Sequence, residues 1–286
     1  MTYRTILVAV SGGSASAGAV DLACRLTTRF KAHLEGFHVQ MDPRDLVIAA
    51  GDPVAGVVIT ELMDKIASDA ATTAAKVKAA FDAALGRANI KLDAKPAVGG
   101  PSAGWREETG YGPVLVARRA RFFDLIVLGR SERVAERPHS DAVEQTLLHS
   151  GRPVLLAPMK PPAAIGETVA LGWNGSPEAV RAMRGALPFL TAAKSVLVIT
   201  VGKPDAAAGT QVVEYLGWHG VKAKHQNVLP VEGVGSGEQL LSAARDGDAD
   251  LLVMGGYGHM PWREFLFGGA TRQIVGASLL PILLSH

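Results

Sequence analysis

The chain has 286 residues, which is long for one ordinary domain and suits two domains of about 100–150 residues each. Hydrophobic residues make up 48% of the sequence and charged residues 20%, a composition that excludes a disordered or fibrous protein. The formal net charge is only +2, without the clustered basic face that nucleic-acid binding needs, so we expect no nucleic-acid partner.

The beginning of the chain, MTYRTILVAVSGG, passes directly from a short charged lead into a strand-like run, which is unlike a secretory signal peptide. No apolar run approaches the roughly 20 residues that a membrane-crossing helix needs. A single cysteine, Cys24, has no partner for an internal disulfide, which fits a reducing compartment. From these features we expect a cytoplasmic protein without a membrane partner.

In the first half of the chain, short β-branched runs alternate with Ala-rich stretches, a pattern typical of a buried parallel sheet with crossover helices. These runs predict strands at residues 5–10, 33–39, 91–98, 125–129 and 154–157. A long helix is predicted at 57–85. Residues of one side of this helix recur every three or four positions and predict a stripe that packs on the core: Val58, Leu62, Ile66, Ala70, Thr73, Val77 and Phe81. The apolar insertion at 41–56 is expected to cover another surface.

The second half repeats this alternation and follows a Pro-rich linker, KPPAAIG, at residues 160–166. Its β-branched runs predict strands at residues 169–173, 196–201, 221–228, 251–255 and 282–284. Five strands with crossover helices are the usual content of a small doubly wound α/β domain. We therefore predict the same fold class for both halves.

The two halves also match each other residue by residue in three places. TILVAVSG at 5–12 matches TVALGWNG at 168–175, and DLIVLG at 124–129 matches DLLVMG at 250–255. A third match pairs SGRPVLL at 150–156 with SLLPILL at 278–284. The order is preserved, which predicts a domain duplication with one domain at 1–160 and the other at 166–286.

Such a duplication is expected to form an internal pseudo-dimer, with a homodimer as a further option. The last strands of the two halves, 154–157 and 282–284, are short and apolar. An uncovered apolar strand edge invites pairing with another strand. We therefore expect these two strands to lie near each other and to form the interface between the halves.

Ligands of open parallel sheets bind at the carboxyl ends of the strands, where the strand order reverses. After the predicted strand at 251–255, three spaced glycines, Gly255, Gly258 and Gly268, lead to the start of a helix. Glycines allow a ligand to approach the backbone closely, and the N-terminus of a helix offers N–H groups to an anion. The pattern predicts a phosphate-binding loop, and the alternative for any single glycine is a tight turn.

This spacing, GxxG, nine residues and then G, resembles the phosphate-binding loop of the universal stress protein family, and the resemblance covers essentially the whole chain. It implies two tandem five-stranded parallel sheets of the Rossmann-like type with strand order 3-2-1-4-5, and ATP, alone or with Mg²⁺, as the ligand. By position, Asn174 would face the adenine, Val201 would line its pocket, and Met254 and Gly255 would approach the ribose and phosphates. The phosphates would be contacted by Gly258, Gly268, Gly269 and Ala270, with His259 as a further contact.

Two residues depart from the family pattern: Asn174 stands where an Asp is usual, and Gly269 replaces a Ser or Thr. An Asn still forms hydrogen bonds but carries no charge. In the first half, Ser140 and Asp141 stand at the places of Gly268 and Gly269, and Glu132 at that of Gly258. Side chains and negative charge there predict that the first half does not hold ATP.

The sequence leaves three functions open. The first is an adenine-nucleotide-binding stress-response protein with at most slow ATP hydrolysis, since no general base or activated nucleophile stands near the glycine loop. The second is an interaction module without nucleotide binding. The third is an ATP pyrophosphatase-type enzyme, because the SGGSAS turn at 11–16 resembles the loop of those enzymes, although a simple strand-to-helix turn explains it better. No catalytic residue and no metal-ligand set is assigned.

Overall fold

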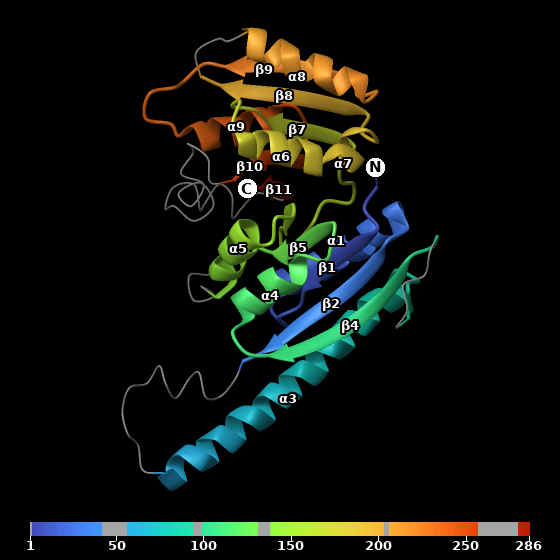
Figure 1. Ribbon diagram of the computed structural model, residues 1–286, viewed down its shortest axis with the longest axis vertical. Coiled ribbons are helices and arrows are strands. Elements are labelled where there is room, and N and C mark those ends of the chain that lie inside the picture. The colour runs from blue at the N-terminus through green and yellow to red at the C-terminus, as the bar shows by residue number, and fades with distance from the viewer. Residues whose placement is uncertain (1, 42–55, 94–98, 131–137, 203–205, 257–279) are drawn as a thin grey trace.

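The computed structural model describes residues 2–41, 56–93, 99–130, 138–202, 206–256 and 280–286. The described chain forms one mostly parallel sheet with helices on both faces, and the sheet runs through the whole molecule (Figure 1). The α/β class is as predicted.

The described residues of the first half form six strands and the helices that connect them. Its elements are β1 (Thr5–Ala9), α1 (Ser14–Phe30), β2 (His33–Gln40), α3 (Gly56–Arg87), β3 (Lys91–Leu92), β4 (Ser102–Thr109), α4 (Gly112–Ala120), β5 (Leu125–Gly129), α5 (Pro138–His149) and β6 (Val154–Ala157). Four of the five predicted strands agree with these bounds to within one residue.

Within the described residues, the second half contributes five strands and the helices that connect them. Its elements are β7 (Thr168–Gly172), α6 (Pro177–Gly185), α7 (Leu187–Leu190), β8 (Ser195–Val201), α8 (Ala206–Trp218), β9 (Ala223–Val228), α9 (Ser236–Asp246), β10 (Leu251–Gly255) and β11 (Ile282–Ser285). All five predicted strands are present, with shifts of one or two residues at their ends.

The strand order is β3-β4-β2-β1-β5-β6-β11-β10-β7-β8-β9. It departs from the predicted pair of five-stranded sheets in two respects: the first half has the additional edge strand β3, and the halves share one continuous sheet. They meet where β6 pairs antiparallel with β11, Leu155 opposite Leu283. All other strand pairs are parallel. The expected interface between the last strands of the halves is thereby confirmed.

The third strand of the first half was predicted wrongly. The expected strand at 91–98 is β3, which contains only Lys91–Leu92 among the described residues, and the strand that pairs with β2 is β4. β4 reads SAGWREET, with exposed charged side chains in its second half. Its backbone is held by hydrogen bonds to β2, so it needs no apolar run, and apolar periodicity could not reveal it.

The long helix α3 runs beside β4 and projects from the body at its N-terminal end (Figure 1). Its C-terminal half packs on the core through Val77 and Phe81, which are 3% and 0% exposed, as predicted. Thr73 was expected on the same stripe but is exposed, because Ala74 takes the buried position in that turn. The side chains of Val58, Leu62 and Ile66 lie outside the described residues, as does the insertion at 42–55.

Buried side chains form two apolar layers, one on each face of the sheet. One layer joins α1 and the C-terminal half of α3 to side chains of both halves, and the other joins α4, α5 and α9. Both layers contain residues from before and after the linker, so the two halves share their cores. Within the described residues, no helix combines the length and the apolar character needed to span a bilayer.

Candidate functional site

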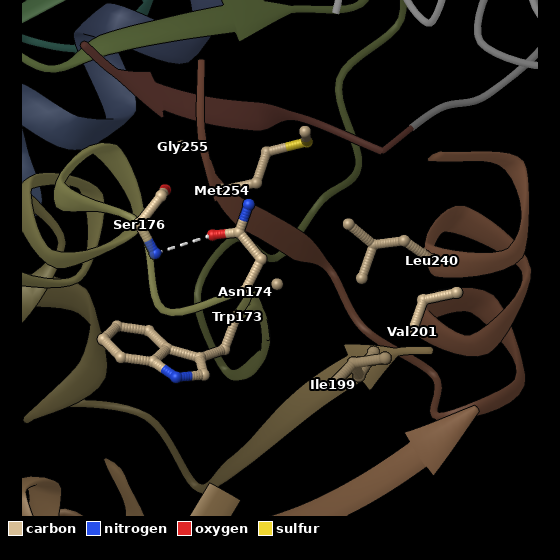
Figure 2. Close-up of a pocket in the computed structure, with 9 residues that line it drawn as sticks. Trp173, Asn174, Ser176, Ile199, Val201, Leu240, Met254 and Gly255 are labelled. Carbon is tan, nitrogen blue, oxygen red and sulfur yellow. Dashed lines mark hydrogen bonds between the residues drawn. The ribbon is translucent and has the colours of Figure 1, made fainter. Parts of the chain in front are cut away.

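A pocket of about 30 Å³ opens at the carboxyl ends of β7, β8 and β10. β7 lies between β8 and β10 in the sheet, so the pocket stands at the point where the strand order of the second half reverses. Figure 2 shows its lining residues, which are Gly172, Trp173, Asn174, Ser176, Ile199, Val201, Leu240, Met254 and Gly255.

Asn174 sits in the turn that connects β7 to α6, and its side chain is fixed by the backbone of that turn. The backbone N–H of Ser176 donates to Asn174 Oδ1 at 3.1 Å (Figure 2). Ser176 in turn caps α6, because its Oγ accepts from the N–H of Ala179 at 3.2 Å. Since the amide oxygen of Asn174 is engaged in this turn, its NH₂ group is what it offers to a ligand, as a hydrogen-bond donor.

The wall beside Asn174 is apolar. Ile199, Leu240 and Met254 are each buried to 98% or more, and they come from β8, α9 and β10. Val201 completes this wall at the end of β8 and is half-buried. An apolar wall next to an amide donor suits a flat ring that has an acceptor nitrogen at its edge.

Trp173 also borders the pocket, but its indole is directed away from Val201 and Leu240 (Figure 2). It packs against the apolar layer on the α1 and α3 side of the sheet, whereas Ile199, Leu240 and Met254 belong to the opposite layer. Trp173 therefore contributes to the packing of that layer.

Gly255 ends β10 and lies against the first turn of α6. A Cβ at this position would stand 2.7 Å from the backbone nitrogen of Ala179 and 2.8 Å from the backbone of Glu178. Helix packing therefore requires glycine here, whether or not a ligand is present. A Cβ at Gly256 would similarly stand 2.7 Å from Cδ2 of Leu147 in α5, so the strand end is also held close to the first half.

Glu178, in the first turn of α6, brings a negative charge next to Gly255. A hydrogen bond from its own backbone N–H is the main cause that holds the pKa of its carboxyl below the usual value; burial acts against it, and a hydrogen bond from Ser176 and the charge of Arg181 lower the pKa further. The guanidinium of Arg181 lies 2.6 Å from the carboxylate and balances its charge. A phosphate beside Gly255 therefore needs its own N–H donors to outweigh this carboxylate.

Four of the predicted site residues, Asn174, Val201, Met254 and Gly255, meet in this one pocket. Gly258, His259, Gly268, Gly269 and Ala270 lie outside the described residues, so their part of the site stays a prediction. Sequence reasoning missed Ile199, Leu240 and Ser176. Ser176 carried a signal, since a Ser before Pro177 marks the start of a helix, but Leu240 reaches the pocket only through the packing of α9 on the sheet.

The first half has a larger cavity, of about 620 Å³, at the corresponding strand ends. Residues of β1, β2, β5, α4 and α5 line it. Asp141, which was predicted to oppose phosphate in this half, is among its lining residues. Glu132 lies outside the described residues.

The SGGSAS segment at 11–16 is the turn from β1 into α1, where the Ser11 N–H donates to Ser16 Oγ at 3.1 Å. Among the described residues, no group of three or more acidic, His or Cys side chains is placed to hold a metal ion.

No protein-family model and no curated protein sequence matches the chain. Solved structures do match. A universal stress protein from Archaeoglobus fulgidus DSM 4304 superposes with a TM-score of 0.69 at 14% identity, covering 99% of this chain and 96% of its own. The chain has the universal stress protein fold. A putative universal stress protein from Pseudomonas aeruginosa UCBPP-PA14 gives a TM-score of 0.52 at 13% identity and covers 99% of this chain. Because both structures cover 99% of this chain, the universal stress protein fold extends over both halves.

Proposed function

We propose that this chain is a tandem universal stress protein that binds an adenine nucleotide, ATP, in its C-terminal half and acts in a stress response. The observation that supports this most directly is the meeting of Asn174, Val201, Met254 and Gly255 at the strand-order reversal of that half. These residues are far apart in the sequence, and the family resemblance implied that all four contact the same ATP molecule.

The proposal assigns a separate part to each section of this site. The amide of Asn174 and the apolar wall around Val201 take the adenine ring. Met254 and Gly255 lie at the end of β10, where the chain continues into the glycine loop. Backbone N–H groups of Gly258, Gly268, Gly269 and Ala270, with His259 beside them, take the phosphates. The two units of the tandem are residues 1–160 and 166–286.

A titration of purified protein with ATP and magnesium tests the assignment. Gly268→Asp adds a side chain and a negative charge where the phosphates are expected, so it should abolish binding. Ser140→Asp places the same charge at the corresponding position of the first half and should leave the affinity unchanged. Unchanged ATP affinity in the Gly268 variant, or loss of ATP binding in the Ser140 variant, would contradict the assignment of the nucleotide site to the second half.

A second candidate, an interaction module without nucleotide binding, is favoured by the pocket volume. About 30 Å³ holds a few water molecules and is far below the roughly 300–1,000 Å³ of small-molecule sites. Mass spectrometry of the freshly purified, denatured protein separates the candidates. Retained ATP supports the nucleotide-binding protein, whereas no retained nucleotide and no binding in the titration supports the interaction module. An adenylated product would support an ATP pyrophosphatase-type enzyme.

A further inference from the structure

The cavity of the first half is large enough to hold a small organic molecule. Its volume of about 620 Å³ falls inside the roughly 300–1,000 Å³ that ligand pockets occupy. It opens at the carboxyl ends of β1, β2 and β5, and β1 lies between the other two in the sheet. The position is thus the strand-order reversal of this half, where a parallel sheet offers a binding site.

Apolar side chains from four elements form most of its wall. Phe37 and Val39 come from β2, Leu128 from β5, and Val116 from α4, and Ala9 ends β1 beneath them. Phe37, Val116 and Leu128 are at most 5% exposed, so the cavity is built into the core of this half. Rigid, packed walls of this kind hold a ligand by burying its apolar surface.

The polar groups of the cavity do not suit an anion. None of the described residues that line it is Lys or Arg, and Asp141 adds a carboxylate in the first turn of α5. Ser11 and Ser16 are joined to each other through the hydrogen bond in the β1–α1 turn. The backbone carbonyl of Val10 accepts a hydrogen bond from the Nδ1 of His38 at 2.7 Å. A phosphate or carboxylate would therefore meet a largely apolar wall with no Lys or Arg among its described residues.

We propose that this cavity binds an uncharged, predominantly apolar small molecule, so that the first half is a ligand-binding unit with a chemistry different from that of the second. The proposal does not rest on nucleotide binding in the C-terminal half. It follows from the cavity volume and the apolar wall, together with the absence of Lys and Arg among the described lining residues.

The neutral, apolar dye N-phenyl-1-naphthylamine, whose fluorescence rises in apolar surroundings, provides the test with the full chain. We expect saturable binding of one dye molecule per chain. Val39→Phe should weaken this binding by roughly tenfold or more, because the ring fills the cavity from β2. Val114→Phe is the matched control: Val114 is on α4 but is 49% exposed and does not line the cavity, so dye binding should not change.

A second variant covers the outcome in which Val39→Phe does not fold. Val39→Thr keeps the size of the side chain and places a hydroxyl on the apolar wall, which should weaken dye binding several-fold with no change in fold. Absence of saturable dye binding to the native chain, or equal binding by the Val39 and Val114 variants, would overturn the proposal. So would displacement of the dye by ATP in a Gly268→Asp chain, because the cavity would then be a nucleotide site.

Discussion

The two halves of the molecule use the same frame to build two different cavities. In the first half, β5 lies beside the first strand, β1, and in the second half β10 lies beside the first strand, β7. A cavity opens where these strands end in each half. In the second half that space is about 30 Å³ and ends in a turn held by Asn174. In the first half it is about 620 Å³, largely apolar, and bordered by Asp141. The two halves thus share one frame, while the residues that line their cavities differ.

The frame is retained because the same backbone contacts recur in both copies. Gly129 and Gly255 each end a strand against the first turn of the helix that follows the first strand of their half. Asp124 and Asp250 each accept hydrogen bonds from the backbone at the start of that first strand. These residues lie in the DLIVLG and DLLVMG repeats, so the repeated sequence marks structure that is common to both halves.

The largest expected effect comes from the matched glycines. An added Cβ at Gly129 would collide with the backbone of Ala15, and one at Gly255 would stand 2.7 Å from the nitrogen of Ala179. Backbone atoms cannot rotate out of the way, so Gly129→Ala and Gly255→Ala should each lower the free energy of unfolding by about 3 kcal/mol. Urea denaturation measures this loss.

The controls are Gly86→Ala in α3 and Gly217→Ala in α8, where an added Cβ meets nothing within 4 Å. Removing a helical glycine should stabilise these variants by a few tenths to about 1 kcal/mol. If Gly129→Ala were tolerated and Gly255→Ala were not, the two halves would not share this contact.

The matched aspartates should have the next largest effect. The Asp124 carboxylate accepts from the N–H groups of Arg4 and Thr5 at 2.8 and 3.0 Å, and that of Asp250 from those of Gly166 and Glu167 at 2.6 and 2.9 Å. Asp124→Ala and Asp250→Ala remove charge-assisted hydrogen bonds, so each should cost about 2 kcal/mol in urea denaturation.

Asp82→Ala is the control for these variants. Asp82 pairs with Lys78 on the exposed side of α3, and such a pair contributes roughly 0.5 kcal/mol or less. A loss at Asp124 or Asp250 no larger than that at Asp82 would contradict a shared role for the two repeats.

The smallest expected effect is a difference between the halves in how folding stability depends on pH. His33 begins β2 opposite Thr5, and Ser195 begins β8 opposite Thr168, so this strand position carries an imidazole ring in the first half and a serine in the second. Burial lowers the pKa of His33 below its usual 6.5, against smaller opposite effects of Glu35 and Asp93. The folded chain therefore binds this proton less readily than the unfolded chain, and stability is lost as pH falls below about 6.5.

His33→Gln should remove this part of the pH dependence, since glutamine does not titrate, while Ser195→Gln should leave it unchanged. Urea denaturation between about pH 7.5 and pH 5.5 gives the comparison. A pH dependence that persists unaltered in His33→Gln would show that the ring is not protonated differently in the folded and unfolded chains.

Much of the fold could be predicted because its signals are local. Apolar runs placed β1, β2, β5 and β6 and their counterparts, and the repeats predicted that both halves have the same fold class. β4 was not predicted because it contains few apolar residues: Ala103 and Trp105 pack on the core, and its second half is charged and exposed. Pairing between strands does not show in the periodicity of one strand.

The site was predictable only in part. Asn174, Met254 and Gly255 follow strand ends, which the sequence reveals, whereas Leu240 enters the pocket from a helix. Asp141 could be found by matching the halves. The cavity around it could not, because its volume depends on how Phe37, Val116 and Leu128 pack across three elements. The glycine loop from Gly258 to Ala270 stays a prediction.

Val39 and Val201 allow the most direct test of the claim that the halves bind different ligands. They hold equivalent places near the ends of β2 and β8, and each lines the cavity of its own half. We would titrate Val39→Phe and Val201→Phe with ATP and magnesium and, separately, with N-phenyl-1-naphthylamine. The account predicts a crossed result: Val201→Phe loses ATP binding and retains the dye, and Val39→Phe loses the dye and retains ATP. Loss of both ligands in one variant, with neither lost in the other, would contradict it.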